Sequence, residues 1–519
     1  MRMTRPRENV PISDAGMPEH VEDGTPASGE SDLFRELTCR LVVWSAVAAW
    51  TAALFAVVRS DYLSFSLARY DLGNMVQAVW STAHGRPLEV TLATGEQAPR
   101  LAAHVDPILA LLAPAWLVWP SPLLLAFVQI AVCALGALPV FWLARKHLGS
   151  EAAGALMALL YLAYPWLAWS ALDAMHPVTL AIPCFMYAIW FLDEGKLARF
   201  ALCAVFVLMT GELMGLTLAF LGLWYWLARG HRRAGLAIAL AGFAWSAIAV
   251  KVIVPHFRGA ESPFYGYYER VGGSPEGVIR TLLTDPGTIA SELASHSNVS
   301  FLLLLGFPLA GLFFLAPGLA AVSAPQLLAV GLSEGTLGTD PRHHYTAAII
   351  PFLIAATALG LARLAPRMRN LVILTLISLS IVTTALVAPW PNAPWADRVL
   401  GEAAQKDLTY SYVKNRYGAR HTSALREAVE KIPADAPVSS TNKAALRLSA
   451  RRYVYSVPIL GRAEWVLLDA QDPWILRKEG HEGGLDGSVV RRLEERLRSS
   501  PNWRIVFNMD DVLVFERVR

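Results

Sequence analysis

Long apolar stretches separated by short polar segments fill the chain from Leu41 to Val387. Several of them approach the roughly 20 residues that an α-helix needs to cross the hydrocarbon core of a bilayer. This pattern predicts an all-α polytopic membrane bundle of about eleven transmembrane helices. The predicted spans are residues 38–58, 121–144, 152–170, 177–193, 197–210, 211–228, 233–254, 299–316, 317–333, 346–364 and 370–388.

Three apolar segments do not fit simple spans. Residues 197–210 and 211–228 are too short to cross comfortably, so they form either a pair with a tight turn near Thr210 or a re-entrant hairpin buried in protein. The segment from His104 to Trp119 is shorter than a span and contains several prolines. We expect it to be a helix at the outer interface of the membrane.

Polar segments flank the bundle on both sides. Residues 1–37 are rich in Pro, Gly, Ser and acidic residues, a composition that predicts a disordered cytoplasmic tail. The tail lacks a basic region followed directly by a short apolar core and a cleavage site, so we expect the first span to be retained. Residues 38–390 then form the transmembrane domain, with a first outer loop at 59–120.

The region 391–519 has a different character, with mixed charge and short elements bounded by turn residues. It predicts a small soluble α/β domain. The predicted strands are 438–440, 452–455, 465–469, 503–507 and 512–517, and the predicted helices are 423–431 and 488–498.

The distribution of Lys and Arg predicts the orientation of the bundle. Cytoplasmic loops are enriched in these residues, and four short connections are basic, at 145–147, 196–199, 229–233 and 363–369. With these inside, the N-terminus is cytoplasmic and the C-terminal domain is extracytoplasmic, as an odd number of spans requires.

Composition excludes several classes of protein. The chain is 55% hydrophobic and 17% charged, and its net charge of +3 with no basic aromatic cluster argues against a nucleic-acid partner. The four cysteines lie in or at the ends of apolar stretches, without metal-ligand spacing. We predict no cofactor. A divalent metal held by histidines from several loops remains possible.

Ionisable residues gather on the predicted outer face. Such groups are costly in lipid, so near a bilayer they tend to face a cavity and serve a function. Glu212 is the clearest example, because no other charge lies near it in the sequence. Two alternatives remain open: Asp71 can cap the helix that begins at Asn74, and Glu212 can be a solvent-exposed turn residue. The further candidates are His104, Asp106, His176, Arg258, Arg342, His343 and His344.

Several short motifs together resemble one bacterial membrane family, domain of unknown function 2079. The opening Tyr70-Asp71-Leu72-Gly73, followed by Gln77 and Trp80, is similar to the first motif of that family. The chain departs from the pattern at Ala103, Met175 and Thr210-Gly211. Further matching segments include His104-Val105-Asp106-Pro107, Tyr164-Pro165, Met175-His176-Pro177, His344-Tyr345 and Ile350-Pro351-Phe352, with Leu467-Leu468-Asp469 in the C-terminal region.

This family resembles the GT-C superfamily of integral-membrane glycosyltransferases. The resemblance implies a GT-C-like fold, a polyprenyl-phosphate-linked sugar donor, membrane lipids as partners and an unidentified acceptor of the cell envelope. It assigns Asp71 the role of base. We expect Glu212 to be the second catalytic residue and the remaining candidates to bind substrate.

Two other classes of function stay open. A transporter or flippase for a lipid-linked or small substrate would use Glu212 as a proton-coupled residue, and an inverted repeat would favour it. A non-catalytic scaffold would only present the C-terminal domain, and it would not need polar residues that converge on one pocket.

Overall fold

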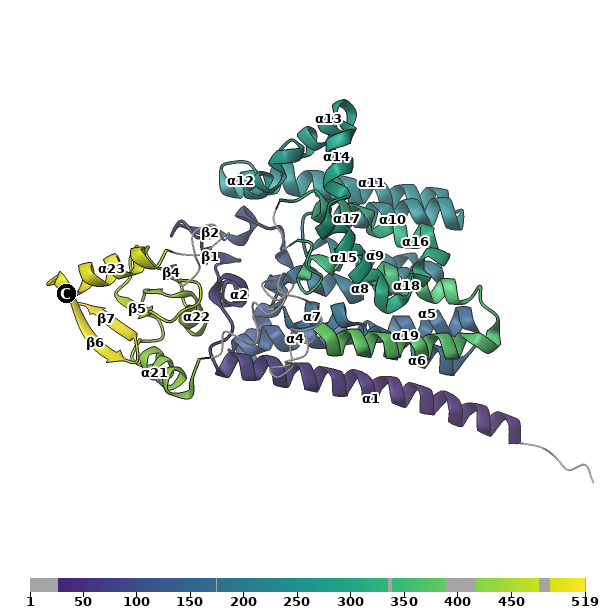
Figure 1. Ribbon diagram of the computed structural model, residues 1–519, viewed down its shortest axis with the longest axis horizontal. Coiled ribbons are helices and arrows are strands. Elements are labelled where there is room, and N and C mark those ends of the chain that lie inside the picture. Colours follow the sequence, from purple (N-terminus) through teal and green to yellow (C-terminus); the bar gives the residue numbers. More distant parts are fainter. Residues whose placement is uncertain (1–26, 174, 335–337, 388–416, 476–485, 519) are drawn as a thin grey trace, which may run out of the picture.

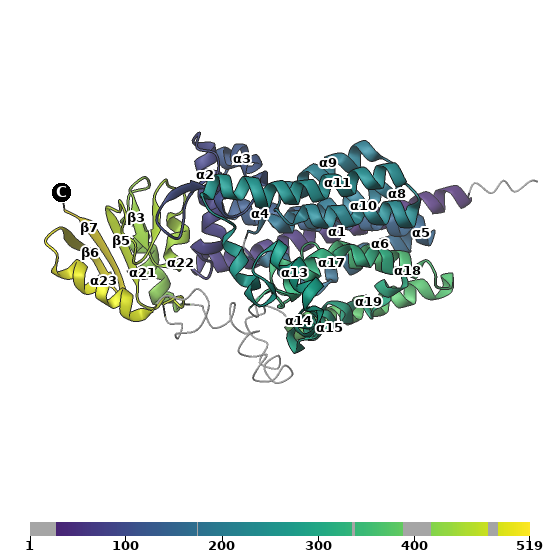
Figure 2. The same cartoon turned by 90° about the horizontal axis from the view of Figure 1, so that it is seen from above.

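The structure is a computed structural model that describes residues 27–173, 175–334, 338–387, 417–475 and 486–518. A helical bundle forms its main body, and a small α/β domain lies against one end (Figures 1 and 2). The first helix, α1 (Ala27–Leu63), runs along the side of the bundle and ends beside the α/β domain. It begins inside the segment that we predicted to be a tail.

The prediction of about eleven spans was wrong. Among the described residues, four helical stretches are long and apolar enough to cross a membrane, or five if one bent pair counts as a span. The bent pair is α6 (Glu151–Ala163) with α7 (Pro165–Leu172), at 50° to each other. The four stretches are Leu33–Leu63 in α1, Pro122–Leu148 in α4 and α5, Arg232–Arg258 in α11 and α12, and Pro366–Leu386 in α19.

Breaks in the helices explain the difference. Proline, glycine and polar residues divide the other apolar stretches into helices of 10–17 residues. A helix rises about 1.5 Å per residue, so these helices are shorter than the roughly 30 Å hydrocarbon core. The shorter apolar helices are Pro107–Val118, Pro177–Asp193, Leu197–Leu208, His296–Leu309, Pro317–Gly331 and Ile350–Leu361.

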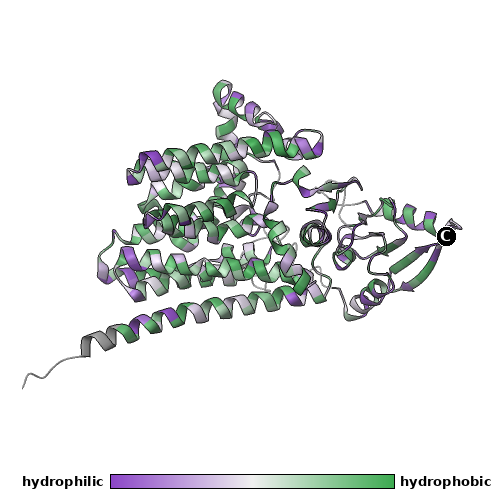
Figure 3. Ribbon diagram, turned by 180° about the vertical axis from the view of Figure 1, so that it is seen from behind, coloured by the Kyte–Doolittle hydropathy of each residue, from purple (hydrophilic) through white to green (hydrophobic). Residues whose placement is uncertain are grey.

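The helices of the bundle have the following bounds. They are α2 (Asn74–Ala83), α3 (Ala113–Val118), α4 (Pro122–Leu135), α5 (Ala137–Leu148), α8 (Ala181–Asp193), α9 (Leu197–Leu208), α10 (Met214–Arg229), α11 (Arg232–Ile248), α12 (Val254–Arg258), α13 (Pro275–Thr284), α14 (Pro286–Leu293), α15 (His296–Gly306), α16 (Pro317–Ala320), α17 (Ala324–Gly331), α18 (Ile350–Leu361) and α19 (Pro366–Val387). Strands β1 (Glu89–Thr91) and β2 (Gln97–Pro99) form a hairpin in the first outer loop. Figure 3 shows hydrophobic residues along the bundle helices and hydrophilic residues mainly near their ends.

Helices α10 and α11 approach each other at small residues. A Cβ added at Gly222 would lie 2.6 Å from the backbone nitrogen of Ala239, and one at Gly242 would lie 2.4 Å from the carbonyl oxygen of Gly215. Such contact between backbones is typical of helices packed in membranes. It holds the two helices together, and Glu212 lies in the turn just before α10.

The four basic connections meet at the end of the bundle away from the α/β domain. Lys146 pairs with Asp193 and Glu194, and Arg229 also contacts Asp193. Arg369 donates to the carbonyl of Leu148 at 3.0 Å. Because these connections share one end of the molecule, all four can lie on the same side of the membrane. That this end is cytoplasmic remains a prediction.

The C-terminal domain contains a five-stranded sheet in the order β4-β3-β5-β7-β6. Strand β3 (Val438–Ser440) pairs parallel with β4 (Val454–Ser456) and with β5 (Trp465–Asp469). Strand β7 (Val512–Arg517) pairs antiparallel with β5 and with β6 (Trp503–Met509). The helices are α21 (Ala419–Glu430), α22 (Asn442–Ala445) and α23 (Gly487–Ser499). The predicted strands and helices of this region are confirmed, while the boundary at 390 lies outside the described residues.

A buried polar network joins α21 to the sheet. His421 lies 3.0 Å from Asp469 through Nε2 and 3.1 Å from Asp510 through Nδ1, and Tyr417 donates to Asp469 at 2.6 Å. Burial lowers the pKa of His421, but the hydrogen bonds and charges of the two carboxylates outweigh burial and raise it above its usual value. The imidazole therefore favours its charged form in the folded domain.

This network predicts a pH-dependent stability. Because the folded pKa of His421 lies above the unfolded value of about 6.5, its stabilisation is complete below that value and is lost as pH rises through the folded pKa. Burial raises the pKa of Asp472 to about 6, so this carboxyl group changes its protonation state at lower pH than His421 does. Amide exchange of β5 and β7 should therefore accelerate as pH rises above about 6.5, after correction for the intrinsic exchange rate. His421→Gln should remove this dependence, and equal profiles for the two proteins would refute it.

Candidate functional site

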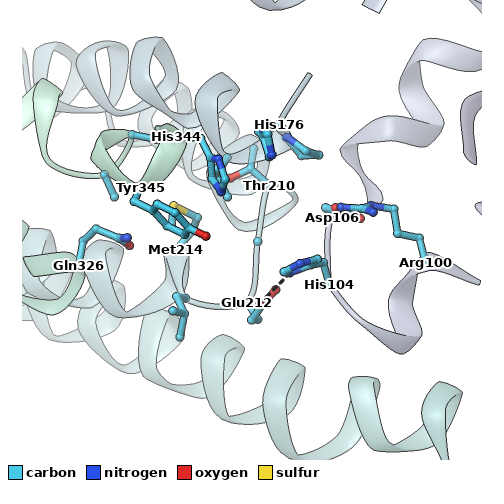
Figure 4. A pocket seen from close by; sticks show the side chains of 16 residues that line it. Arg100, His104, Asp106, His176, Thr210, Glu212, Met214, Gln326, His344 and Tyr345 are labelled. Atoms are coloured by element: carbon cyan, nitrogen blue, oxygen red, sulfur yellow. Dashed lines mark hydrogen bonds and ion pairs between the residues drawn. The ribbon is translucent and has the colours of Figure 1, made fainter. Parts of the chain in front are cut away.

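A cavity of about 140 Å³ opens where several helices break near the C-terminal domain (Figure 4). The turn before α10 forms one wall, and the segments that precede α8 and α18 form another. The first outer loop closes a third side. Irregular backbone at such a place requires protein or water around it. The polar and ionisable residues that line the cavity are Arg100, His104, Asp106, His176, Thr210, Glu212, Gln326, His344 and Tyr345.

Glu212 and His104 form a pair across the cavity floor. Nδ1 of His104 lies 3.2 Å from Oε1 of Glu212, and the backbone N–H of Val105 donates to Oε2 at 3.1 Å. Burial raises the pKa of Glu212, but His104 and the hydrogen bonds outweigh burial and lower it to about 2. Both carboxylate oxygens are thus engaged, which favours a positioning role for Glu212 over proton transfer.

Arg100 and Asp106 form a second, more deeply buried pair. Nε of Arg100 lies 2.7 Å from Oδ2 of Asp106, whereas Oδ1 of Asp106 is buried without a hydrogen-bond partner. Burial raises the pKa of Asp106, although Arg100 opposes the shift. An unpartnered buried oxygen is costly, and this one borders a cavity that can hold a ligand or water. The carboxylate also fixes the guanidinium of Arg100 at the cavity wall.

Three histidines lie close to the carboxylate of Asp173. Its Oδ2 accepts from the backbone N–H of His344 at 2.8 Å, and it lies 3.0 Å from Nδ1 of His344. His343 and His176 approach the same oxygen at 3.6 and 3.8 Å. Burial raises the pKa of Asp173, but the three imidazoles outweigh burial and hold it well below its usual range. Asp173 is therefore an ionised acceptor.

Burial determines the protonation state of His344, and the contact with Asp173 determines which ring nitrogen carries the proton. Burial and the neighbouring His176 lower its pKa to about 3, despite the favourable contact with Asp173. His344 is then neutral, with its proton on Nδ1 facing Asp173. This tautomer leaves a lone pair on Nε2, so His344 can accept but cannot donate a hydrogen bond there.

Gln129, on α4, fixes the loop that carries His176. Its amide donates to the carbonyls of Ser170 and Ala171 at 3.3 and 3.1 Å. Its carbonyl oxygen accepts from the backbone N–H of His176 and from the hydroxyl of Thr179, both at 2.8 Å. A single buried side chain thereby ties both sides of the loop to a membrane span.

Asp71 lies at the edge of the cavity, outside its lining. It sits in a π-helical turn, Arg69–Gly73, with a side chain 52% exposed. Oδ1 of Asp71 lies 3.7 Å from Nε2 of His176. The alternative role as a helix cap is wrong, because the residue before α2 is Gly73 and no side chain caps that helix. His176 is the link between Asp71 and the cavity.

The C-terminal domain holds the turn that carries Asp71. Oδ1 of Asn442 accepts from the backbone N–H groups of Arg69 and Tyr70, at 3.1 and 3.2 Å. The guanidinium of Arg69 is 1% exposed and donates to the hydroxyl of Ser456 at 2.8 Å. The ring of Tyr70 stacks on Trp474, with centroids 5.0 Å apart. The C-terminal domain therefore holds the backbone turn that positions Asp71.

Comparison with known proteins places the chain in a family. It matches the family model described as "Predicted membrane protein (DUF2079)" over residues 61–514. The chain belongs to this family. No curated protein matches it.

Two solved structures match this DUF2079 protein. One is the crystal structure of ArnT from Cupriavidus metallidurans bound to undecaprenyl phosphate, with 13% identity, 91% of this chain and 98% of that chain covered, and a TM-score of 0.50. The other is the apo Archaeoglobus fulgidus oligosaccharyltransferase, with 13% identity, 81% and 70% covered, and a TM-score of 0.40. The likeness to ArnT shows a GT-C-like fold.

The structure brings together most, but not all, of the residues expected at the site of this DUF2079 protein. His343 contacts Asp173 but does not line the cavity. Arg342 is buried beside Asp340, which it contacts through Nε at 2.9 Å, and does not line the cavity. Arg258 is exposed at the end of α12. The expected residues that line the cavity are His104, Asp106, His176, Glu212 and His344.

Sequence reasoning missed several lining residues. Arg100 begins a short 3-10 helix, Arg100–Ala102, and its pairing with Asp106 depends on a turn that no local sequence pattern predicts. Asp173 does not line the cavity but contacts two histidines that do, His176 and His344. Its convergence with the histidines that precede α18 depends on the tertiary fold. Tyr345 follows His344 in a motif that the family resemblance had marked, so that signal could have found it. Gln326 carries no such signal.

Three residues of this DUF2079 protein could hold a metal ion. One ligand atom from each of Asp173, His176 and His344 lies within 4.8 Å of the others. However, the two imidazoles are stacked, with centroids 3.7 Å apart and planes at 12°. Their in-plane lone pairs therefore lie in nearly parallel, separate planes and do not meet at one point, so a shared ion requires one ring to turn. As placed, the cluster suits hydrogen bonding better than coordination.

The contact between Asn442 and the Asp71 turn leads to a prediction. Asn442→Ala removes the acceptor of two backbone N–H groups, each hydrogen bond contributing about 1 kcal/mol. We expect amide exchange at Arg69 and Tyr70 to rise by roughly tenfold, as measured by hydrogen–deuterium exchange. Asn442→Asp keeps the oxygen acceptor and should preserve the protection. Unchanged exchange in Asn442→Ala would show that Asn442 does not hold this turn.

Proposed function

We propose that this protein is a membrane glycosyltransferase that moves a sugar from a polyprenyl-phosphate donor to an acceptor of the cell envelope at the outer face. The observation that carries the proposal is Asp71 at the edge of a polar cavity, built where the bundle helices break beside the soluble domain. The fold shared with ArnT, whose crystal structure contains undecaprenyl phosphate, supports the class of lipid donor.

In the proposed reaction, the oxygen of an acceptor hydroxyl attacks the anomeric carbon of the donor sugar. The bond from that carbon to the phosphate oxygen breaks, and polyprenyl phosphate leaves with the electron pair. The proton of the hydroxyl passes to the carboxylate of Asp71 as general base. Its half-exposed side chain leaves space for an acceptor, and His176 at 3.7 Å borders the same position.

The cavity residues then have distinct roles. Arg100 brings a positive charge toward the departing phosphate, and Asp106 fixes its orientation. Glu212 positions His104. Neutral His344 presents Nε2, which suits acceptance of a hydrogen bond from a sugar hydroxyl. We assign no contact with the phosphate to Arg258, Arg342 or His343, because none of them lines the cavity.

The role of Asp71 can be tested by sugar transfer from a radiolabelled polyprenyl-phosphate donor pool in membranes that contain the full chain. Asp71→Asn keeps the size of the side chain but removes its basicity, so transfer should fall by roughly 10²- to 10⁴-fold. The matched control is Glu96→Gln, which neutralises an exposed acid of the same outer loop and should leave transfer unchanged.

The outcomes separate two levels of the proposal. Wild-type transfer by Asp71→Asn would remove Asp71 as the base while leaving the transferase assignment intact. If the wild-type protein transfers sugar from none of the plausible polyprenyl-phosphate donors, the transferase assignment itself is overturned. That result would favour a transporter.

A further inference from the structure

Helix α13 (Pro275–Thr284) carries an apolar face that the protein leaves uncovered. No residue of this helix is buried, and Ile279, Leu282 and Leu283 are 59%, 51% and 77% exposed. Their spacing places them on one face of a helix, whereas Thr281 and Thr284 fall on the other. Glu276 lies at the edge of the apolar face, one helical heptad before Leu283. Burial of a Leu or Ile side chain is worth about 1.5–3 kcal/mol, so this face favours an apolar environment.

The uncovered face lies beside an apolar helical stretch whose surface is mostly exposed. The stretch Arg232–Arg258 passes the test for a membrane span, and only 28% of its apolar window is buried. Near its outer end, Ile248, Val252 and Phe257 are exposed. In Figure 1, α13 and α14 project sideways from the bundle beside α11, short of the outer end that α12 marks. Helix α13 therefore lies level with this apolar stretch and not beyond its end.

An ion pair ties α13 to that span. Nζ of Lys251 lies 2.8 Å from Oε1 of Glu276, and Lys251 belongs to a π-helical turn, Ala249–Ile253, between α11 and α12. Ser274 caps the start of α13, its hydroxyl accepting from the backbone N–H of Gly277 at 3.0 Å. The helix is thus anchored at its N-terminal end, which fixes the direction of its apolar face.

The segment just before α13 reaches the cavity. In this aromatic segment, Pro263–Val271, the ring of Phe264 stacks on His104 with centroids 4.5 Å apart and planes at 24°. The hydroxyl of Tyr268 donates to the carbonyl of Ala329 at 3.0 Å, and the carbonyl of Tyr267 accepts from the backbone N–H of Glu334. A continuous arm therefore connects α13 to a residue that lines the cavity.

We propose that α13 is an interfacial helix whose Ile279, Leu282 and Leu283 face sits in the acyl chains of the outer leaflet, and that this contact holds Phe264 over His104. The occupant of the uncovered face is bilayer lipid. An amphipathic helix of this kind lies in the plane of the interface. The consequence is that the membrane itself helps to order one side of the cavity, whatever reaction or transport the cavity serves.

Lipid contact can be measured directly. The full chain is reconstituted in nanodiscs of phosphatidylcholine that carries a diazirine near the middle of one acyl chain, and labelled residues are identified by mass spectrometry after photolysis. We expect labels at Ile279, Leu282 and Leu283, with several-fold fewer at Thr281 and Thr284 on the opposite face. Labelling of the apolar face only by a water-soluble carbene reagent would overturn the proposal, as would cross-links from α13 to a second copy of the chain in place of lipid.

Substitutions test the coupling to the cavity. Leu283→Glu should abolish lipid labelling of α13 and raise the rate at which diethyl pyrocarbonate modifies His104 by several-fold, because Phe264 is then less firmly held. Thr284→Glu adds the same charge at the next position, on the polar face, and should change neither readout. Leu283→Ser provides a milder variant if the charged one fails to fold. Lost lipid labelling with unchanged reactivity of His104 would refute the coupling. Neither readout depends on sugar transfer.

Discussion

The buried guanidinium of Arg69 is the contact on which the outer half of this molecule depends. It joins its own turn to two other segments, because it donates to Thr91 in β1, to Val454 in β4 and to Ser456 at the end of β4. Burial lowers its pKa to about 10, so it stays charged at neutral pH. A buried charge that lost these acceptors would be costly. The position of Asp71, two residues later, follows from this arrangement.

The cavity depends on a second constraint, the interruption of helices in an apolar bundle. Each break frees backbone groups that need partners, and in a membrane these can only be protein or water in a cavity. The breaks before α8, α10 and α18 lie close together, and side chains such as Gln129 satisfy several freed groups at once. A polar cavity beside lipid is therefore a direct product of helices that are too short to span.

How far the sequence predicts the structure differs between the two domains. The strands and helices of the C-terminal domain were predictable because their periodicity and turn residues agree. The number of spans was not, because hydropathy reports how apolar a segment is but not whether Pro165 bends it or a turn such as that at Glu212 divides it. At the site, topology placed Glu212, His104 and His176 on one side. The pairing of Arg100 with Asp106 depends on loop geometry that hydropathy does not encode.

The tie between Arg69 and Asn442 spans 373 positions of the chain. At about 5–20 residues per second, a ribosome needs roughly 20–75 s to synthesise the segment between them. During that time the first span is available for insertion, but the turn that bears Asp71 lacks its final support. The turn that bears Asp71 therefore gains this support only after the C-terminal domain has been synthesised. A nascent or prematurely terminated chain would enter the bilayer with this carboxylate unplaced, so competence would arise only after the final domain has folded.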